Sequence, residues 1–110
     1  MGGRPLNKVL DPMPAVDASA EIRELGQVAQ LLISRGFRVT RVLPISESSF
    51  GNFAVDFSNG PANIQVTRDR GQFIFDGDRK ALEAAGLWRA FHSPDSALTP
   101  LTAWLSDHGV

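Results

Sequence analysis

Apolar and polar residues alternate in the middle of the chain, over residues 50 to 76, FGNFAVDFSNGPANIQVTRDRGQFIFD. In its first part every second residue is a large apolar one, at Phe53, Val55 and Phe57. A period of two is typical of a strand that buries one face. The stretch therefore predicts three short antiparallel strands whose apolar side chains share one face of a sheet.

The first reversal falls at Asn59-Gly60, a pair that favours a two-residue hairpin loop because both residues tolerate positive φ. This loop predicts an apolar face that pairs Phe57 with Ala62, Val55 with Ile64 and Phe53 with Val66. The other face would pair Asp56 with Asn63, Ala54 with Gln65 and Asn52 with Thr67. Pro61 has no N–H donor, so we expect it at the start of the second strand, outside the ladder.

Two loops compete at the second reversal. A three-residue loop with Gly71 in the left-handed region suits the turn chemistry, but it moves Phe73 and Phe75 to the polar face. A two-residue loop, Arg70-Gly71, pairs Val66 with Phe75 and Arg68 with Phe73. We favour the two-residue loop because burying each Phe contributes ~1.5–3 kcal/mol. Arg68 then lies on the apolar face near its rim, with its stem over Phe73 and its head in solvent.

A helix is predicted over residues 18 to 35, capped by Asp17 or Ser19 and ended by Gly36. Its apolar stripe has helical spacing: Ile22, Leu25, Ala29, Leu32 and Ile33. Gly26 lies inside this helix at a cost of about 1 kcal/mol relative to Ala. We expect it to let the sheet approach closely.

Residues 37 to 45 predict the first strand, with Val39 opposite Phe57 and Leu43 opposite Phe53. Pro44 indicates an edge strand or a bulge. A loop over residues 47 to 49 would connect it to the next strand.

After Phe75 the pattern becomes helical. One helix is expected from residue 79, and the sequence leaves open whether it ends at Gly86 or continues to Phe91. Ser93-Pro94 and Thr99-Pro100 are both typical helix starts. The predicted class is α+β: an N-terminal helix, a four-stranded antiparallel meander and C-terminal helices, all packed on one sheet face. Residues 1–16 are predicted to be a flexible segment, and residues 17–110 a single domain.

Composition narrows the class of protein. The 43% hydrophobic and 21% charged residues among 110 are ordinary for one globular domain. The net charge of −1 gives no general attraction to nucleic acid or anionic membranes. The chain has no cysteine, which excludes disulfides and thiol chemistry and fits a cytoplasmic protein. No apolar run approaches the ~18 residues of a membrane span, so none is expected.

The chain contains no recognisable catalytic or cofactor motif. Its two histidines, His92 and His108, have no metal-binding spacing, and we interpret them as surface residues near helix ends. Nucleophile-elbow, P-loop and dinucleotide-binding patterns are absent from the sequence. The carboxylates on or beside the sheet are interpreted as turn, cap and surface residues: Asp56, Asp69, Asp76 and Asp78. We therefore expect no enzyme, no cofactor and no metal.

Polar residues of the predicted sheet form the candidate binding site. The Arg-Asp-Arg turn is its best recognition element, because arginine offers paired donors to a carboxylate of a partner. The candidate partner-binding residues are Asp56, Gln65, Thr67, Arg68, Asp69, Arg70 and Gln72. We expect the partner to be another protein, and the exposed edge of the first strand leaves a homodimer open.

Two other functions are alternatives. A small-molecule binder or small enzyme would use a sheet-edge cleft with Asp56 and Arg70. Nucleic-acid binding is the second alternative. Residues 50 to 57 match the aromatic strand of RNA-recognition motifs only superficially, because Asn52 breaks the spacing and no basic residue precedes it. The aromatic residues of that family are exposed for stacking on bases, whereas alternation with polar residues here predicts burial.

The segments SSFGNFAVDF and RDRGQFIFDG, within residues 48 to 77, resemble small bacterial proteins that share an FGN…RDRGQ sheet core. Some members of that group are similar to immunity proteins of bacterial toxin systems. The resemblance implies a non-catalytic protein that binds a partner, and it assigns no functional residue.

Overall fold

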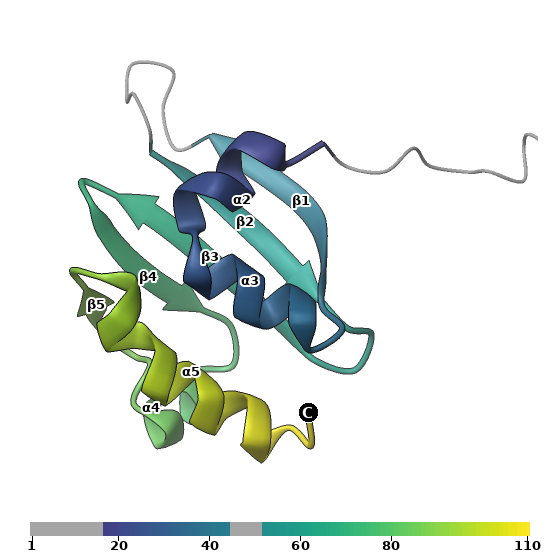
Figure 1. Ribbon diagram of the computed structural model, residues 1–110. Coiled ribbons are helices and arrows are strands. Elements are labelled where there is room, and N and C mark those ends of the chain that lie inside the picture. Colours follow the sequence, from purple (N-terminus) through teal and green to yellow (C-terminus); the bar gives the residue numbers. More distant parts are fainter. Residues whose placement is uncertain (1–16, 45–51) are drawn as a thin grey trace, which may run out of the picture.

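The computed structural model describes residues 17–44 and 52–110 (Figure 1). The elements, in chain order, are α2 (Ser19–Leu25), α3 (Gln27–Ser34), β1 (Arg38–Pro44), β2 (Phe53–Ser58), β3 (Asn63–Asp69), β4 (Gln72–Asp76), α4 (Arg79–Ala85), β5 (Ala90–Phe91) and α5 (Pro94–Asp107). The α+β class is therefore confirmed. The predicted N-terminal segment 1–16 and the predicted loop at residues 47 to 49 lie outside the described residues.

The strands form one antiparallel sheet in the order β1-β2-β3-β4-β5. The prediction of four strands was one too few, because Ala90 and Phe91 pair with Ile74 and Phe73 of β4. Phe91 is buried, and its ring and the Phe75 ring pack in a T-shaped arrangement with 5.8 Å between centroids. A strand of two residues shows no alternation of apolar and polar positions, so the sequence did not predict β5. Its pairing with β4 and the contact of Phe91 with Phe75 hold it in the sheet.

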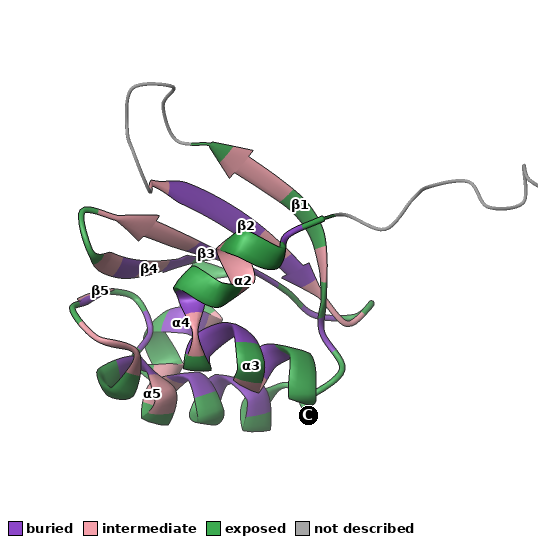
Figure 2. Ribbon diagram, turned by 45° about the horizontal axis from the view of Figure 1, so that its top comes forward, coloured by how far each residue is buried: buried purple, intermediate pink, exposed green. Residues whose placement is uncertain are grey.

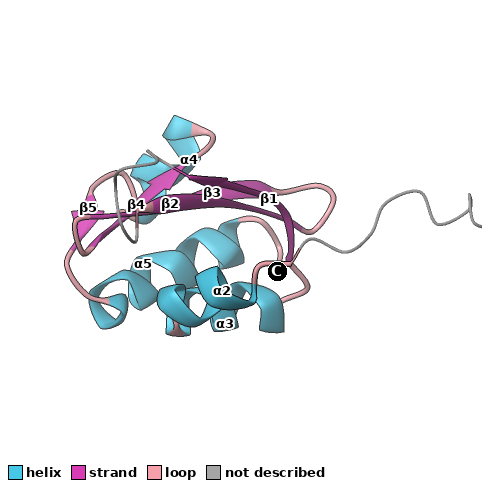
Figure 3. Cartoon of the chain, turned by 90° about the horizontal axis from the view of Figure 1, so that it is seen from above, coloured by secondary structure: helices cyan, strands magenta, loops and turns pink. Residues whose placement is uncertain are grey.

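The apolar face of the sheet is covered by α2, α3 and α5 (Figure 3). Figure 2 shows the buried residues on the facing sides of these helices and strands. Phe53, Phe57 and Phe75 are 8%, 1% and 2% exposed, which confirms that the phenylalanines point inward. They share one core with fully buried helix residues: Leu25, Leu32, Leu101 and Leu105.

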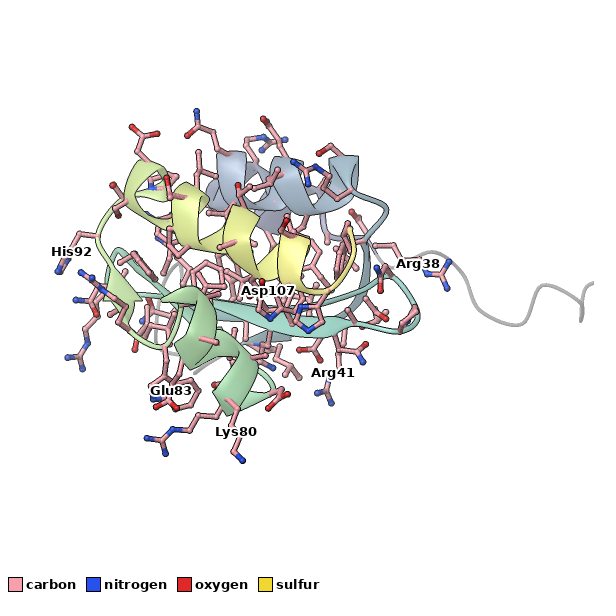
Figure 4. All side chains as sticks on the ribbon, turned by 90° about the horizontal axis from the view of Figure 1, so that it is seen from below. Arg38, Arg41, Lys80, Glu83, His92 and Asp107 are labelled. Atoms are coloured by element: carbon pink, nitrogen blue, oxygen red, sulfur yellow. The ribbon has the colours of Figure 1, made fainter. Side chains whose placement is uncertain are left out.

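Helix α4 is the exception to the prediction that every helix covers one face. It lies beyond the end of β4 and projects to the other side of the sheet (Figures 3 and 4). The chain turns into α4 directly after β4, at Gly77 with φ +154°. Only Leu82 of this helix is fully buried, so α4 has no apolar stripe that would hold it flat against the sheet.

The β2–β3 register differs from the prediction by two residues. Phe57 pairs with Ile64, Val55 with Val66 and Phe53 with Arg68, so the loop spans residues 59 to 62. In a two-residue loop Pro61 would have to donate a closing N–H that it lacks. The longer loop instead closes between the N–H of Asn59 and the carbonyl of Ala62, 3.1 Å apart. A shift of two keeps each side chain on its predicted face.

The β3–β4 hairpin has the predicted two-residue loop. Val66 pairs with Phe75 and Arg68 with Phe73. Arg70 and Gly71 have φ of +54° and +80°, the pattern of a type I′ turn. The backbone N–H of Arg70 also donates to the side-chain oxygen of Asn52 at 3.0 Å, which fixes the arginine in this conformation.

A bulge in β1 explains a second register error. Val39 pairs with Phe57 as predicted, but Leu43 pairs with Ala54 and not with Phe53. The register shifts between Val39 and Arg41, which inserts one residue into the edge strand. Val42 therefore packs against the core, and Leu43 moves to the other face. Of the two alternatives that Pro44 indicated, the edge strand is confirmed, since β1 is the outermost strand; the bulge lies earlier in the same strand.

The single helix predicted for residues 18 to 35 is two helices, α2 and α3, separated by Gly26. Gly26 has φ +57° and ψ −125°, a backbone conformation that is not helical and that side chains disfavour. A Cβ at this position would meet nothing closer than a carbonyl oxygen at 4.0 Å. The glycine is therefore needed for the bend, and not for the predicted close approach of the sheet.

The C-terminal region resolves the alternative that the sequence left open. Helix α4 ends at Gly86, which is left-handed at φ +85°, and the N–H of Leu87 donates to the Leu82 carbonyl at 2.8 Å. Helix α5 begins at Ser93-Pro94, as predicted, with the Ser93 side chain accepting from the Ser96 N–H. The predicted second start at Thr99-Pro100 was wrong, since Pro100 lies inside α5.

Substituting Gly26→Ala tests the bend. In an uninterrupted helix this change would stabilise the protein by up to about 1 kcal/mol. At the observed φ and ψ we expect the opposite, a loss of about 1–3 kcal/mol in the free energy of unfolding. Urea denaturation followed by circular dichroism measures the difference. Gln27→Ala, at the exposed next position, is the control with little expected change, and a more stable Gly26→Ala protein would contradict the bend.

Candidate partner-binding face

The sheet has a second side, opposite α2, α3 and α5, which we call the outer face. Strand alternation and register place on it Arg38, Arg41, Leu43, Ala54, Asp56, Ser58, Asn63, Gln65, Thr67, Asp69, Gln72, Ile74 and Asp76. Figure 4 shows Arg41 on this side, together with Lys80 and Glu83 of the projecting helix α4. Helix α4 thus borders one end of the outer face.

A hydrogen-bonded cluster crosses three strands at the centre of the outer face. Arg41 Nε donates to Asp56 Oδ2 and Gln65 Nε2 donates to Asp56 Oδ1, both at 2.8 Å. The β1 bulge creates this cluster because it brings Arg41 opposite Asp56. Both oxygens of the carboxylate already accept a hydrogen bond, so Asp56 orders its neighbours and is poorly placed to act as a general base.

A hollow of about 380 Å³ lies beside this cluster, where β4 leaves the sheet. Strand β3 starts at Asn63, whereas the last pair between β3 and β4 is Gln65 with Asp76, so the first residues of β3 lack a β4 neighbour. We call this hollow the notch. Its polar lining comprises Thr40, Asp56, Asn63, Gln65 and Asp76.

A second hollow of about 310 Å³ adjoins the notch and shares Asp76 with it. Trp88 and Ile74 contribute apolar surface there. Trp88 is 40% exposed, and Arg79 of α4 lies 5.0 Å from the centre of its ring. Such a partly exposed tryptophan is typical of the residues that dominate protein interfaces.

Most of the predicted binding residues gather on this surface. Asp56, Gln65, Thr67, Asp69 and Gln72 all lie on the outer face. Arg70 lies at the tip of the β3–β4 hairpin, where its side chain is 90% exposed and 4.0 Å from Asp69. The alternative cleft with Asp56 and Arg70 does not form, because Asp56 lines the notch and Arg70 does not.

Arg68 is separated from the other predicted binding residues. As predicted it lies on the apolar face and over Phe73, with its guanidinium carbon 4.6 Å from the ring centre. The guanidinium reaches solvent only in part, since the side chain is 25% exposed, and Nη1 donates to the Glu24 carbonyl of α2 at 2.9 Å. Nε is buried, with no hydrogen-bond partner in the described part of the chain. Arg68 therefore joins the sheet to α2.

Sequence reasoning missed the contributions of Asp76 and Trp88 to the site. Asp76 and Asp78 were both interpreted as turn, cap or surface residues; Asp78 occupies the cap position, whereas Asp76 lines both hollows. Trp88 follows directly after the helix-ending pair Gly86-Leu87. Only Gly86 signalled that the helix would end before Trp88, so that this side chain would not lie on a buried helix face.

The two histidines lie away from the outer face cluster. His92 and His108 are both exposed. The ring of His108 stacks on Trp104 with centroids 4.2 Å apart, and its Nδ1 is 2.8 Å from the Trp104 carbonyl.

Within residues 17–44 and 52–110, no group of three potential metal ligands occurs. No helix in these ranges is both long and apolar enough to cross a membrane.

No family model, curated protein or solved structure matches this chain. The function must therefore be argued from the outer face itself.

Replacing Arg68 tests whether it has a structural role. Arg68→Met keeps an unbranched stem on Phe73 and removes the buried Nε, so we expect stability within about 1 kcal/mol of wild type. Arg68→Ala removes the stem contacts and should lose about 1–3 kcal/mol. Thermal unfolding compares the two proteins. Equal losses in both variants would show that the charge, and not the packing of the stem, stabilises this position.

Proposed function

We propose that this chain is a non-enzymatic protein-binding module that docks its partner on the outer face. The observation that carries the proposal is the one-sided cover of the sheet: α2, α3 and α5 cover the apolar face, whereas of the described helices only α4 lies on the other side, at one end of the outer face (Figure 3). The open surface combines polar residues with half-exposed Leu43 and Ile74 and with Trp88 at its border. This mixture is typical of interfaces between proteins that also exist apart.

The chemistry of the outer face favours a binding role over catalysis. The central carboxylate, Asp56, already accepts hydrogen bonds from Arg41 and Gln65.

Charge also favours a protein over a nucleic acid. Among the described strand residues, the outer face has three carboxylates, Asp56, Asp69 and Asp76, and two arginines, Arg38 and Arg41, so it has no excess of positive charge. A phosphate backbone requires an excess of positive charge at the contact surface. An immunity-like or adaptor-like role in the cytoplasm fits the proposal, and the sequence resemblance of residues 48 to 77 supports the same class.

A matched pair of substitutions tests docking through the outer face. Gln72→Arg adds a long cationic side chain to the outer face, whereas Gln30→Arg adds the same side chain to the exposed side of α3. We expect Gln72→Arg to weaken partner binding by about tenfold or more through steric and charge mismatch, and Gln30→Arg to leave it unchanged. Affinity capture from native lysate with quantitative mass spectrometry identifies the partner, and titration of that partner measures the affinity.

Unfolding curves of both variants should coincide with wild type within about 0.5 kcal/mol, because neither position is buried. Equal binding by Gln72→Arg and Gln30→Arg would place the interface elsewhere. The absence of any captured protein in repeated experiments would count against a binding module.

A further inference from the structure

We infer that the notch and the Trp88 hollow together receive a partner segment in which a lysine or arginine stands next to an apolar residue. This inference rests on the proposed function, since it names the partner chemistry of the same outer face. The cation would enter the notch between Asp56 and Asp76, and the apolar neighbour would pack on Trp88 and Ile74.

The lining of the notch selects a hydrogen-bond donor that carries positive charge. Both charged side chains in it, Asp56 and Asp76, are carboxylates, and the amide oxygens of Asn63 and Gln65 and the Thr40 hydroxyl add further acceptors. Asp76 is exposed and forms no side-chain hydrogen bond or ion pair with the part of the chain that the structure describes. A guanidinium or ammonium group complements such a set of acceptors.

Among the described residues, the neighbouring cations of the protein itself leave Asp76 without an ion-pair partner, although one of them binds Asp56. The Arg41 Nε is committed to Asp56 Oδ2 at 2.8 Å. Arg79 is paired with Glu83 at 3.2 Å and lies over Trp88. The guanidinium of Arg89 lies 5.1 Å from the ring centre of Phe91, a residue of the apolar face. An incoming cation therefore meets Asp76 with the nearby arginines already engaged.

The second hollow explains why the residue next to the cation in the partner segment should be apolar. It shares Asp76 with the notch, and Ile74, Ala90, the partly exposed Trp88 and Arg89 also line it. A residue that follows the cation in an extended segment is ~3.3 Å further along, and its side chain reaches a different site from that of the cation. Arginine and lysine stems can also pack on Ile74 while the charged head reaches Asp76.

The glycine that turns the chain into α4 gives the notch its shape. Gly77 passes close to the start of β3, where a Cβ would lie 3.4 Å from the Asn63 carbonyl oxygen. Its φ of +154° is a conformation that other residues rarely adopt. The position of Asp76 at the rim is therefore set by the backbone and does not depend on a flexible loop.

Short peptides titrated into isotope-labelled protein test the inference by NMR. The probe is acetyl-Leu-Arg-Leu-amide, and the matched controls carry Glu or Gln in place of Arg. We expect saturable shifts of the Gln65 and Gly77 amides and of the Trp88 indole N–H with the Arg peptide, with a dissociation constant of about 1 mM. The Glu peptide should cause none, and added salt should weaken the Arg peptide.

Variants assign the response to the two hollows. Asp76→Asn keeps the shape and should weaken the Arg peptide about twofold to fivefold, the range of a solvent-exposed ion pair. Asp76→Lys should abolish binding, and Trp88→Ala should weaken it, whereas Asp95→Asn on α5 should have no effect. Amide spectra without peptide establish that each variant is folded. Equal responses to the Arg and Glu peptides, or an unchanged response in Asp76→Lys, would overturn the inference.

Binding of the captured partner by the Gln72→Arg and Asp76→Lys variants distinguishes failure of this inference from failure of the proposed function. Loss of the partner in Gln72→Arg but not in Asp76→Lys would refute the notch as a recognition site and leave docking on the outer face standing. Retention of the partner in both variants would refute docking on the outer face as well. Loss in both would support the two proposals together.

Discussion

The structure depends on the burial of one face of a twisted ribbon. Phe57, Phe73 and Phe75 are almost fully buried with Val55 and Val66, and all five side chains project from the same side of three adjacent strands. Burial of each of the three aromatic side chains contributes ~1.5–3 kcal/mol. Exposing this face would therefore cost more free energy than the other contacts of the protein could offset. Helices α2, α3 and α5 complete the core on that side.

The same asymmetry creates the candidate binding surface. Because one face is covered, the other must remain compatible with water, and its polar residues are ordered by contacts within the sheet. The β1 bulge supplies the clearest case, since it rotates Arg41 onto Asp56 while it moves Val42 into the core. One inserted residue at the edge strand thus serves packing on one side and electrostatics on the other.

Positive φ angles mark the points where the chain changes direction. Gly26 separates two helices, Arg70-Gly71 reverses the sheet, and Gly77 sends α4 past the end of β4. The last of these turns leaves the first residues of β3 without a β4 neighbour and so forms the notch. The recognition surface that we propose is therefore a consequence of backbone geometry as much as of side-chain chemistry.

The sequence by itself determined which side of the sheet each strand residue faces, for β2, β3 and β4. A period of two survives a register shift of two, so the burial of Phe53 and Phe57 and the place of Gln65 on the outer face followed from the pattern even though the loop at Asn59-Gly60 was misjudged. The Arg70-Gly71 loop also followed, because the alternative would have exposed two phenylalanines.

Only the tertiary structure decided the features that depend on contacts between distant residues. The bulge requires β2 beside β1, β5 requires the Phe75 ring to pack against Phe91, and Arg68 meets the Glu24 carbonyl 44 residues away. Local patterns record the period of a strand or helix, but not where the chain bends to bring two elements together. The place of α4, and with it the notch and the exposure of Trp88, was fixed by such bends, which is why these parts of the candidate site were absent from the prediction.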